Sequence, residues 1–532
     1  MTQEGEERMR NTTTLAALAA GLLLAAPVAA QELRIGMKAQ VDNADPHQLF
    51  TPNRNVQLHV YEPLAWQDER LRPVPRLATS WRVLDPLTWE FTLREGVTFQ
   101  DGSPLTTEDV IFSIRRAQEI EGARTYRVYV RNIVAMEASG PRTVVIRTNE
   151  PSPMLPSMLT SFGIVSAKAA RDAQQSDWNG GRAAIGTGPY RWIRFTPGQD
   201  VVLERNASYW GGAEPWSRVN FRFVPNDSAR VAALLAGDLD VIDTVPPSLH
   251  ARVRESDRTH MLSATSSFTL YMQVDQKRDR SPFVTGPDGQ ALDRNPLRDR
   301  RVRQAITHSL NRTAIAERAM EGAAEPAGQF QPPGFIGHVP SIAPPAFDPA
   351  LSRRLLSEAG YPNGFGITVH CTSDRFAGDG RVCQTVGQML TAIGIRAQVD
   401  AMPASVFFRR AGTATSDPDF SMLMSIFSGL PGTGQENMAA LLRTFDAPTG
   451  LGMANRGRYS SPALDRLLAT ADATMDDAQR ERLVAQATTL AMEDVALMPI
   501  FFWKASWGLR RGLTMTPRGD QYTYATDIRA AR

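Results

Sequence analysis

The segment PRLATSWRVLDPLTWEFTLREGVTFQDGSPLTTEDVIFSIRRA, residues 75–117, carries more information about the fold than any other part of the chain. Apolar residues alternate from Trp89 to Leu93, which predicts a strand with one buried face. A turn rich in glycine, aspartate and proline follows. Thr106 with Asp109 then approximates the capping box that begins a helix. The segment therefore predicts a β-turn-α unit.

The first 30 residues have the pattern of an export signal. Two arginines precede an uncharged run whose centre, residues 15–26, is almost entirely leucine, alanine and glycine. This run is shorter than the roughly 20 apolar residues that a membrane span needs. The small residues that follow predict cleavage after Ala30, whether the chain starts at Met1 or Met9. We expect a soluble periplasmic protein, and the competing interpretation is a buried structural helix.

The charge balance argues against nucleic acid or an anionic membrane as a main partner. The formal net charge is +2, and removing a leader with three glutamates and two arginines raises it to +3. The two cysteines, Cys371 and Cys383, predict a disulfide in an oxidising compartment. A metal site is not expected, because the spacing differs from that of a zinc site and only His370 lies nearby. We expect no cofactor.

A chain of 532 residues predicts two or three domains. The segment GTGPYRWIRFTPGQDVVLERNASYWGG, residues 186–212, predicts a hairpin about a Pro-Gly turn. LRDRRVRQAITHSLNRTAI, residues 297–315, predicts an amphipathic helix. Its arginines at 300, 301 and 303 belong to a solvated face, and the less favoured alternative is nucleic-acid contact.

The C-terminal half alternates between predicted strands and helices. A helix over 380–393 is followed by strands over 395–400 and 420–425, a rhythm that indicates an α/β sheet. MPIFFW, residues 498–503, predicts one more short apolar strand.

Taken in order, these segments closely resemble solute-binding protein family 5, the extracytoplasmic binding proteins of dipeptide-, oligopeptide- and nickel-type ABC importers. The resemblance implies an α/β, two-lobed periplasmic-binding-protein fold of the large, type II-like peptide-binding class. It implies a first lobe over 31–267 that contains an extra subdomain over about 63–185. The second lobe spans 268–497, and residues 498–532 return to the first.

The resemblance also implies a function. We expect a monomeric receptor that captures a small solute by cleft closure and delivers it to an ABC permease in the inner membrane. The solute is a peptide or a peptide-like, carboxylate-bearing compound. The alternatives on the same fold are glutathione, a nickel chelate, an opine or a sugar. A secreted hydrolase is the rival class, but His-Glu-x-x-His and Gly-x-Ser-x-Gly motifs are missing from the sequence, so we expect no enzyme.

Family members hold a free peptide by its two charged ends. Arg375 aligns with their carboxylate-binding arginine, and the alternative is a surface arginine paired with Asp374 or Asp379. The amine-binding aspartate is missing from the run SIFSGLPGTGQENM, residues 425–438. The candidates for ligand contact in this run are Phe427, Ser428, Gly429 and Glu436. Ile426 or Phe427 occupies the position of a family tryptophan, and Ser428-Gly429 stands near the position of the aspartate. Glu436 is the only acid in the loop.

Two interpretations of this glycine-rich loop stay open. Its backbone N–H groups can bind a polar or anionic ligand, or the loop is simply a flexible surface connection. Asn43 follows the first predicted strand, and Thr265 and Ser266 lie where a strand would cross between the lobes. We expect these three residues to open onto the same cleft.

Overall fold

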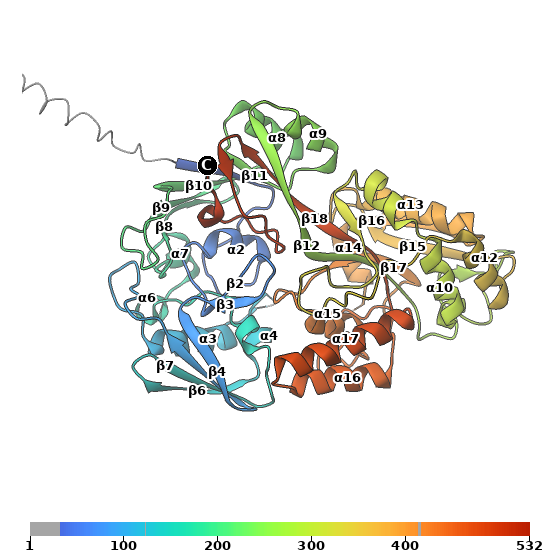
Figure 1. Cartoon of the computed structure of the whole chain (residues 1–532), viewed down its shortest axis with the longest axis horizontal. Coiled ribbons are helices and arrows are strands. Elements are labelled where there is room, and N and C mark those ends of the chain that lie inside the picture. Colours follow the sequence, from blue (N-terminus) through green and yellow to red (C-terminus); the bar gives the residue numbers. More distant parts are fainter. Residues whose placement is uncertain (1–31, 123, 413–415, 532) are drawn as a thin grey trace, which may run out of the picture.

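The computed structural model describes residues 32–122, 124–412 and 416–531. Figure 1 shows a mixed α/β molecule of two lobes, which are joined by the long strands β12 (Thr259–Val274) and β18 (Met498–Arg510). The predicted leader and its cleavage site after Ala30 lie outside the described residues. Among the residues that are described, no helix is long and apolar enough to cross a membrane.

A 12-stranded sheet runs through both lobes in the order β13-β15-β17-β12-β18-β11-β1-β10-β9-β8, with β14 beside β18 and β16 beside β15. Its strands in the first lobe are β1 (Glu32–Met37), β8 (Tyr190–Thr196), β9 (Asp200–Arg205), β10 (Arg218–Phe223) and β11 (Val241–Asp243). Its strands in the second lobe are β13 (Val284–Thr285), β14 (Ala324–Pro326), β15 (Gly366–Thr372), β16 (Arg396–Met402) and β17 (Met422–Phe427).

Both crossing strands are longer than the sequence predicts. They pair antiparallel from Thr259 with Arg510 to Met272 with Met498, and the register shifts between Thr265 and Thr269. Such an interruption of the ladder bends a strand locally. On the first-lobe side of the bend, β18 lies between β12 and β11. On the second-lobe side, β12 also pairs with β17.

The first lobe carries a separate four-stranded sheet. It has the order β4 (Ala78–Asp85), β5 (Thr88–Leu93), β7 (Thr143–Thr148), β6 (Ile133–Gly140), and β2 (Ala65–Gln67) pairs with β3 (Pro73–Pro75) beside it. The predicted alternation in β5 is confirmed, since Trp89, Phe91 and Leu93 are buried. The next helix begins at the predicted capping box, in which Thr106 and Asp109 bond to each other's backbone N–H. The segment 75–117 thus builds the core of this subdomain.

Helices cover the sheets of both lobes (Figure 1). Those of the first lobe are α2 (Thr51–Gln57), α3 (Thr107–Glu119), α4 (Arg127–Val130), α5 (Leu155–Met158), α6 (Ala167–Ala170), α7 (Gln175–Asn179), α8 (Asp227–Ala236) and α9 (His250–Arg254). Those of the second are α10 (Arg300–Ser309), α11 (Arg312–Ala314), α12 (Pro349–Glu358), α13 (Asp379–Ala392), α14 (Ala404–Arg410), α15 (Gly434–Leu442), α16 (Pro462–Ala473) and α17 (Asp477–Glu493). The tail ends in the pair β19 (Leu513–Thr514) and β20 (Arg529–Ala530).

Each lobe has its own apolar cores. One core of the first lobe joins β1, β9 and β10 to the tail, and another fills the extra subdomain. The second lobe has a core around β15, β17 and α13 and a second one among α15, α16 and α17. Lobes with separate cores can rotate about a hinge without breaking either core.

The prediction that Arg303 lies on a solvated face of α10 is wrong. Its side chain is buried and donates hydrogen bonds to the carbonyl oxygens of Leu297, Arg298, Asp494 and Val495. Arg300 and Arg301 are exposed, as predicted. The pattern missed Arg303 because residues 494–495, which satisfy its donors, are remote in the sequence.

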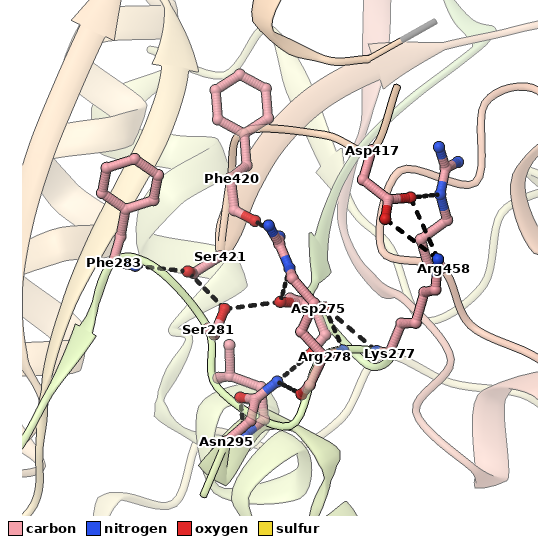
Figure 2. Close-up of polar contacts among 11 residues, drawn as sticks. Asp275, Lys277, Arg278, Ser281, Phe283, Asn295, Asp417, Phe420, Ser421 and Arg458 are labelled. Atoms are coloured by element: carbon pink, nitrogen blue, oxygen red, sulfur yellow. Dashed lines mark hydrogen bonds and ion pairs between the residues drawn. The ribbon is translucent and has the colours of Figure 1, made fainter. Parts of the chain in front are cut away.

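Figure 2 shows a polar cluster just beyond the end of β12. The buried carboxylate of Asp275 accepts hydrogen bonds from the Arg278 side chain and the Ser281 hydroxyl. The Ser281 oxygen also lies 2.6 Å from the hydroxyl of Ser421, which precedes β17. Asn295 donates to the carbonyl oxygens of Asp275 and Arg278. The cluster fixes the loop after β12 against the start of β17, the strand that leads into the candidate site.

Candidate ligand-binding site between the lobes

The two lobes meet at the loop that follows β17. The Gln67 side chain of the first lobe donates a hydrogen bond to the carbonyl oxygen of Leu430, 3.1 Å away. Leu430 packs against the apolar core of the extra subdomain. Gly432 lies so close to Leu71 that an added Cβ would come within 2.2 Å of Leu71 Cδ1. Residues 428–436 therefore form part of the surface of the second lobe that touches the first.

Three predicted residues at the start of this loop make internal contacts. The Ser428 hydroxyl donates to Ser267 Oγ on β12, at 2.8 Å. The Gly429 N–H donates to Asn437 Oδ1, at 2.8 Å, so this amide is already occupied. The Phe427 ring lies 6.3 Å from that of Phe330. These contacts fit neither interpretation of the loop. The Gly429 N–H is not a free donor, and the start of the loop is fixed rather than loosely connected.

Glu436 is the loop residue with an unsatisfied polar group. It lies in the first turn of α15, and its Oε2 is sealed from solvent without a hydrogen-bond partner in the part of the chain that the structure describes. Burial raises its pKa to about 8, because a low-dielectric surrounding disfavours the ionised carboxylate. Across the lobe boundary, Tyr129 of α4 has a pKa raised first by burial and then by the charge of Glu436.

Arg375 lies in the loop between β15 and α13, and its side chain is exposed. Its guanidinium stands 6.0 Å from the Phe408 ring and makes no ion pair with any described residue. The alternative pairing with Asp374 or Asp379 is not present. Asp374 accepts the Ala404 N–H, and Asp379 accepts the Thr372 hydroxyl and the Arg375 backbone N–H. The guanidinium is therefore free to meet an anion.

The Arg375 loop is held at both ends by a covalent link. Cys371 at the end of β15 and Cys383 in α13 form a disulfide bond. Both sulfurs are buried in the core of the second lobe. In the described part of the chain, no group of three or more histidine, cysteine, aspartate or glutamate residues could hold a metal ion.

The structure places the other three predicted residues in local contacts. Asn43 accepts the Asp45 N–H and donates to Asp42, as in a turn. Thr265 pairs with Lys504 in the ladder of the crossing strands. Ser266 is buried, and its hydroxyl donates to the Trp503 carbonyl oxygen, at 2.7 Å. Thr265 and Ser266 thus belong to the hinge itself.

A small pocket of about 10 Å³ lies beside this hinge. Its walls come from both lobes and from β18, and they include Thr244, Ala323, Ala377, Trp503, Lys504 and Gln521. Ala377 belongs to the same loop as Arg375, so the loop reaches the hinge pocket. Lys504 is paired with Glu325, at 3.4 Å.

Sequence reasoning missed Arg54, on α2 of the first lobe. The helix has a polar sequence, TPNRNVQ, yet its last five residues are buried. Asn53, Asn55 and Gln57 find partners within the protein. Arg54 Nε and Nη1 are buried without a hydrogen-bond partner among the described residues. A polar run on a short helix beside a predicted cleft was the available signal.

The comparisons with known proteins agree with this geometry. Residues 72–448 match the family described as bacterial extracellular solute-binding proteins, family 5. The chain belongs to this family. It is thus a solute-binding protein of an ABC importer. The glutathione-binding protein GsiB of Escherichia coli O1:K1 / APEC is 28% identical over 509 residues, covering 93% of this chain and 94% of GsiB.

Two solved structures show the same fold at low sequence identity. The ABC transporter substrate-binding protein CtaP from Listeria monocytogenes superposes with a TM-score of 0.80 at 19% identity, covering 94% of this chain and 99% of CtaP. AgaA from A. tumefaciens R10, solved in complex with agropinic acid, has a TM-score of 0.72 at 23% identity. The match covers 94% of this chain and 99% of AgaA. The predicted family and two-lobed fold are thereby confirmed.

Proposed function

We propose that this family 5 protein captures a small carboxylate-bearing solute, peptide or peptide-like, between its lobes and delivers it to an inner-membrane ABC permease. The observation that carries the proposal is the free guanidinium of Arg375 on a loop that reaches the hinge pocket. A carboxylate that leaves water inside a closed cleft needs a cationic or hydrogen-bonding partner. Arg375 supplies such a partner in the second lobe.

The solute need not be a free peptide. Ser428 and Gly429 stand where relatives of the peptide type have the amine-binding aspartate, and both residues are engaged by protein partners. Glutathione, an opine, a nickel chelate or a sugar on the same fold is therefore the second candidate class. Acetylating the amine of a bound solute should change affinity little. A large loss that disappears in Glu436→Gln would instead assign the amine to Glu436.

The proposal includes the way the protein works in the cell. It acts as a periplasmic monomer, cleaved after Ala30, and it releases its solute unchanged rather than hydrolysing it. The proposal keeps the lobe boundaries expected from the sequence, with 31–267 and 498–532 in the first lobe and 268–497 in the second. N-terminal sequencing of periplasmic material tests the cleavage site, and incubation with peptides tests for turnover. Recovery of hydrolysed product would replace the receptor with an enzyme.

The decisive experiment identifies the solute and then removes Arg375. Native mass spectrometry of protein purified from the periplasm should reveal one bound molecule that carries a carboxylate. Calorimetric titration with that molecule should show that Arg375→Ala loses about 2–5 kcal/mol of binding free energy. Arg381→Ala is the matched control, because this nearby arginine of α13 is paired with Glu321 at the surface. Equal losses in both variants would contradict the proposal.

A further inference from the structure

We infer that Arg54 is an anion-binding residue of the first lobe and that the solute carries an acidic group which reaches it. The inference rests on the proposed function, because it assigns a second residue, on the opposite lobe from Arg375, to the same captured molecule. It also narrows the solute to an acid whose carboxylate enters the first lobe.

The geometry of Arg54 is unusual for a buried arginine. Arg54 is 2% exposed. Among the described residues, the one hydrogen bond of its side chain runs from Nη2 to the Thr160 carbonyl oxygen, at 3.4 Å. Nε and Nη1 remain without partners among the described residues. The guanidinium lies 5.3 Å from the ring of Tyr522. Two nitrogens of the guanidinium, which together carry three N–H donors, therefore have no acceptor among the described residues.

Arg518 shows what a structural arginine looks like in the same place. It is similarly buried, and it lies 4.9 Å from the ring of Tyr524. Its side chain pairs with Asp520 and donates to the carbonyl oxygens of Gln67 and Asp68. Arg518 is thus fully engaged, whereas Arg54 is the described buried arginine with two unpartnered nitrogens.

Among the described residues, no carboxylate forms an ion pair with Arg54. The pKa of Arg54 is pulled down by burial, but Tyr522, Tyr126, Tyr524 and Asp520 outweigh this and keep it raised. Asp520 is bonded to Arg518 rather than to Arg54. A charge that is buried and unpaired is costly, so a ligand carboxylate that paired with Arg54 would offset part of that cost.

The surroundings place Arg54 at the boundary between the lobes. The pKa of Tyr129 is raised first by burial and then by Glu436 of the second lobe, and Arg54 lowers it. Figure 1 shows α4, which carries Tyr129, on the side of the subdomain that faces α15 and α17. The ring of Tyr522 lies beside the guanidinium, and the Tyr126 ring lies 6.3 Å from that of Tyr129.

The first test compares ligand-free thermal melts of Arg54→Gln and Arg518→Gln. A residue that waits for an anion contributes little to the empty protein, so Arg54→Gln should melt at the wild-type temperature or above it. Arg518→Gln breaks a satisfied network and should melt lower. An equal loss in both variants would show that Arg54 is structural and would overturn the inference.

The second test titrates glutathione and trialanine, each as the free acid and with its carboxylates converted to amides. At least one free acid should raise the wild-type melting temperature, and its amide should not. Arg54→Gln should bind that acid at least tenfold more weakly, and Arg54→Lys should fall between, because lysine keeps the charge without the fork. Unchanged affinity in Arg54→Gln overturns the inference. A wild type that no probe stabilises counts against the proposed function, and the ligand-free melts then decide the role of Arg54.

Discussion

The side-chain amide of Gln67 in the first lobe donates a hydrogen bond to the carbonyl oxygen of Leu430 in the second, with 3.1 Å between the two atoms. The two residues are 363 positions apart, and Gln67 is buried. This bond therefore forms only when the loop after β17 lies against the first lobe. It is a direct contact of the closed arrangement, made by protein atoms alone.

Gln67→Ala should shift the ligand-free protein toward an open arrangement. One hydrogen bond contributes about 0.5–1.5 kcal/mol, enough to change the balance between two states that differ by a few kcal/mol. Small-angle scattering should report a larger radius of gyration. Gln118→Ala is the control, because Gln118 donates to Val130 and Ile133 within the subdomain. The prediction fails if both variants scatter as the wild type does.

Gly429→Ala should move the carboxyl of Glu436 at little cost in stability. An added Cβ would lie 2.4 Å from Glu436 Oε2, so the flexible end of that side chain must rotate away. We expect a loss of about 1 kcal/mol, at the low end of the usual cost of overpacking, and a lower pKa for Glu436 in a wetter position. NMR titration of the carboxyl carbon measures the pKa. Gly380→Ala has open space around its Cβ and serves as the control.

Asp275→Asn should destabilise the second lobe. The substitution weakens a buried carboxylate that holds Arg278 and Ser281 (Figure 2), so unfolding should require about 2–4 kcal/mol less. Asp417→Asn is the matched control, because Asp417 is half exposed in its pairs with Lys277 and Arg458. Exposed pairs contribute about 0–1 kcal/mol. Equal midpoints in urea for the two variants would contradict a structural role for the cluster.

Local signals in the sequence predicted much of the fold. The alternation at Trp89 and Phe91 and the capping box at Thr106 depend on neighbours within a few residues, and the structure has both. The hairpin also appears, as β8 and β9, with Gly198 at a φ of +74° in the turn. Such features are fixed by turn chemistry and periodicity, which a single sequence records.

Contacts between distant segments were not predictable in the same way. The full length of β12 and β18 depends on their pairing, which joins residues more than two hundred positions apart. Arg303 is buried because carbonyl groups near residue 495 receive its donors. Arg54 resembles any surface arginine until the fold buries α2. The amide of Gly429 resembles a free donor until Asn437 occupies it.

Glu436 should make stability depend on pH. Burial raises its folded pKa to about 8, whereas a glutamate in the unfolded chain titrates near 4.3. Between these values the folded protein holds a proton that the unfolded chain has released. Stability must therefore fall as pH rises from about 4.3 to about 8, and it should change no further above that.

Glu436→Gln should remove this dependence, because glutamine keeps the shape of the protonated acid without its ionisation. The variant should match the wild type near pH 5 and exceed it at pH 9, by about 1–4 kcal/mol in the free energy of unfolding. Urea unfolding at pH 5, 7 and 9 measures the difference, in which other titrating groups cancel. Glu481→Gln removes the same charge from an exposed residue of α17 and controls for net charge. Parallel pH profiles for wild type and Glu436→Gln would show that the carboxyl of Glu436 is solvated and that the loop does not close over it.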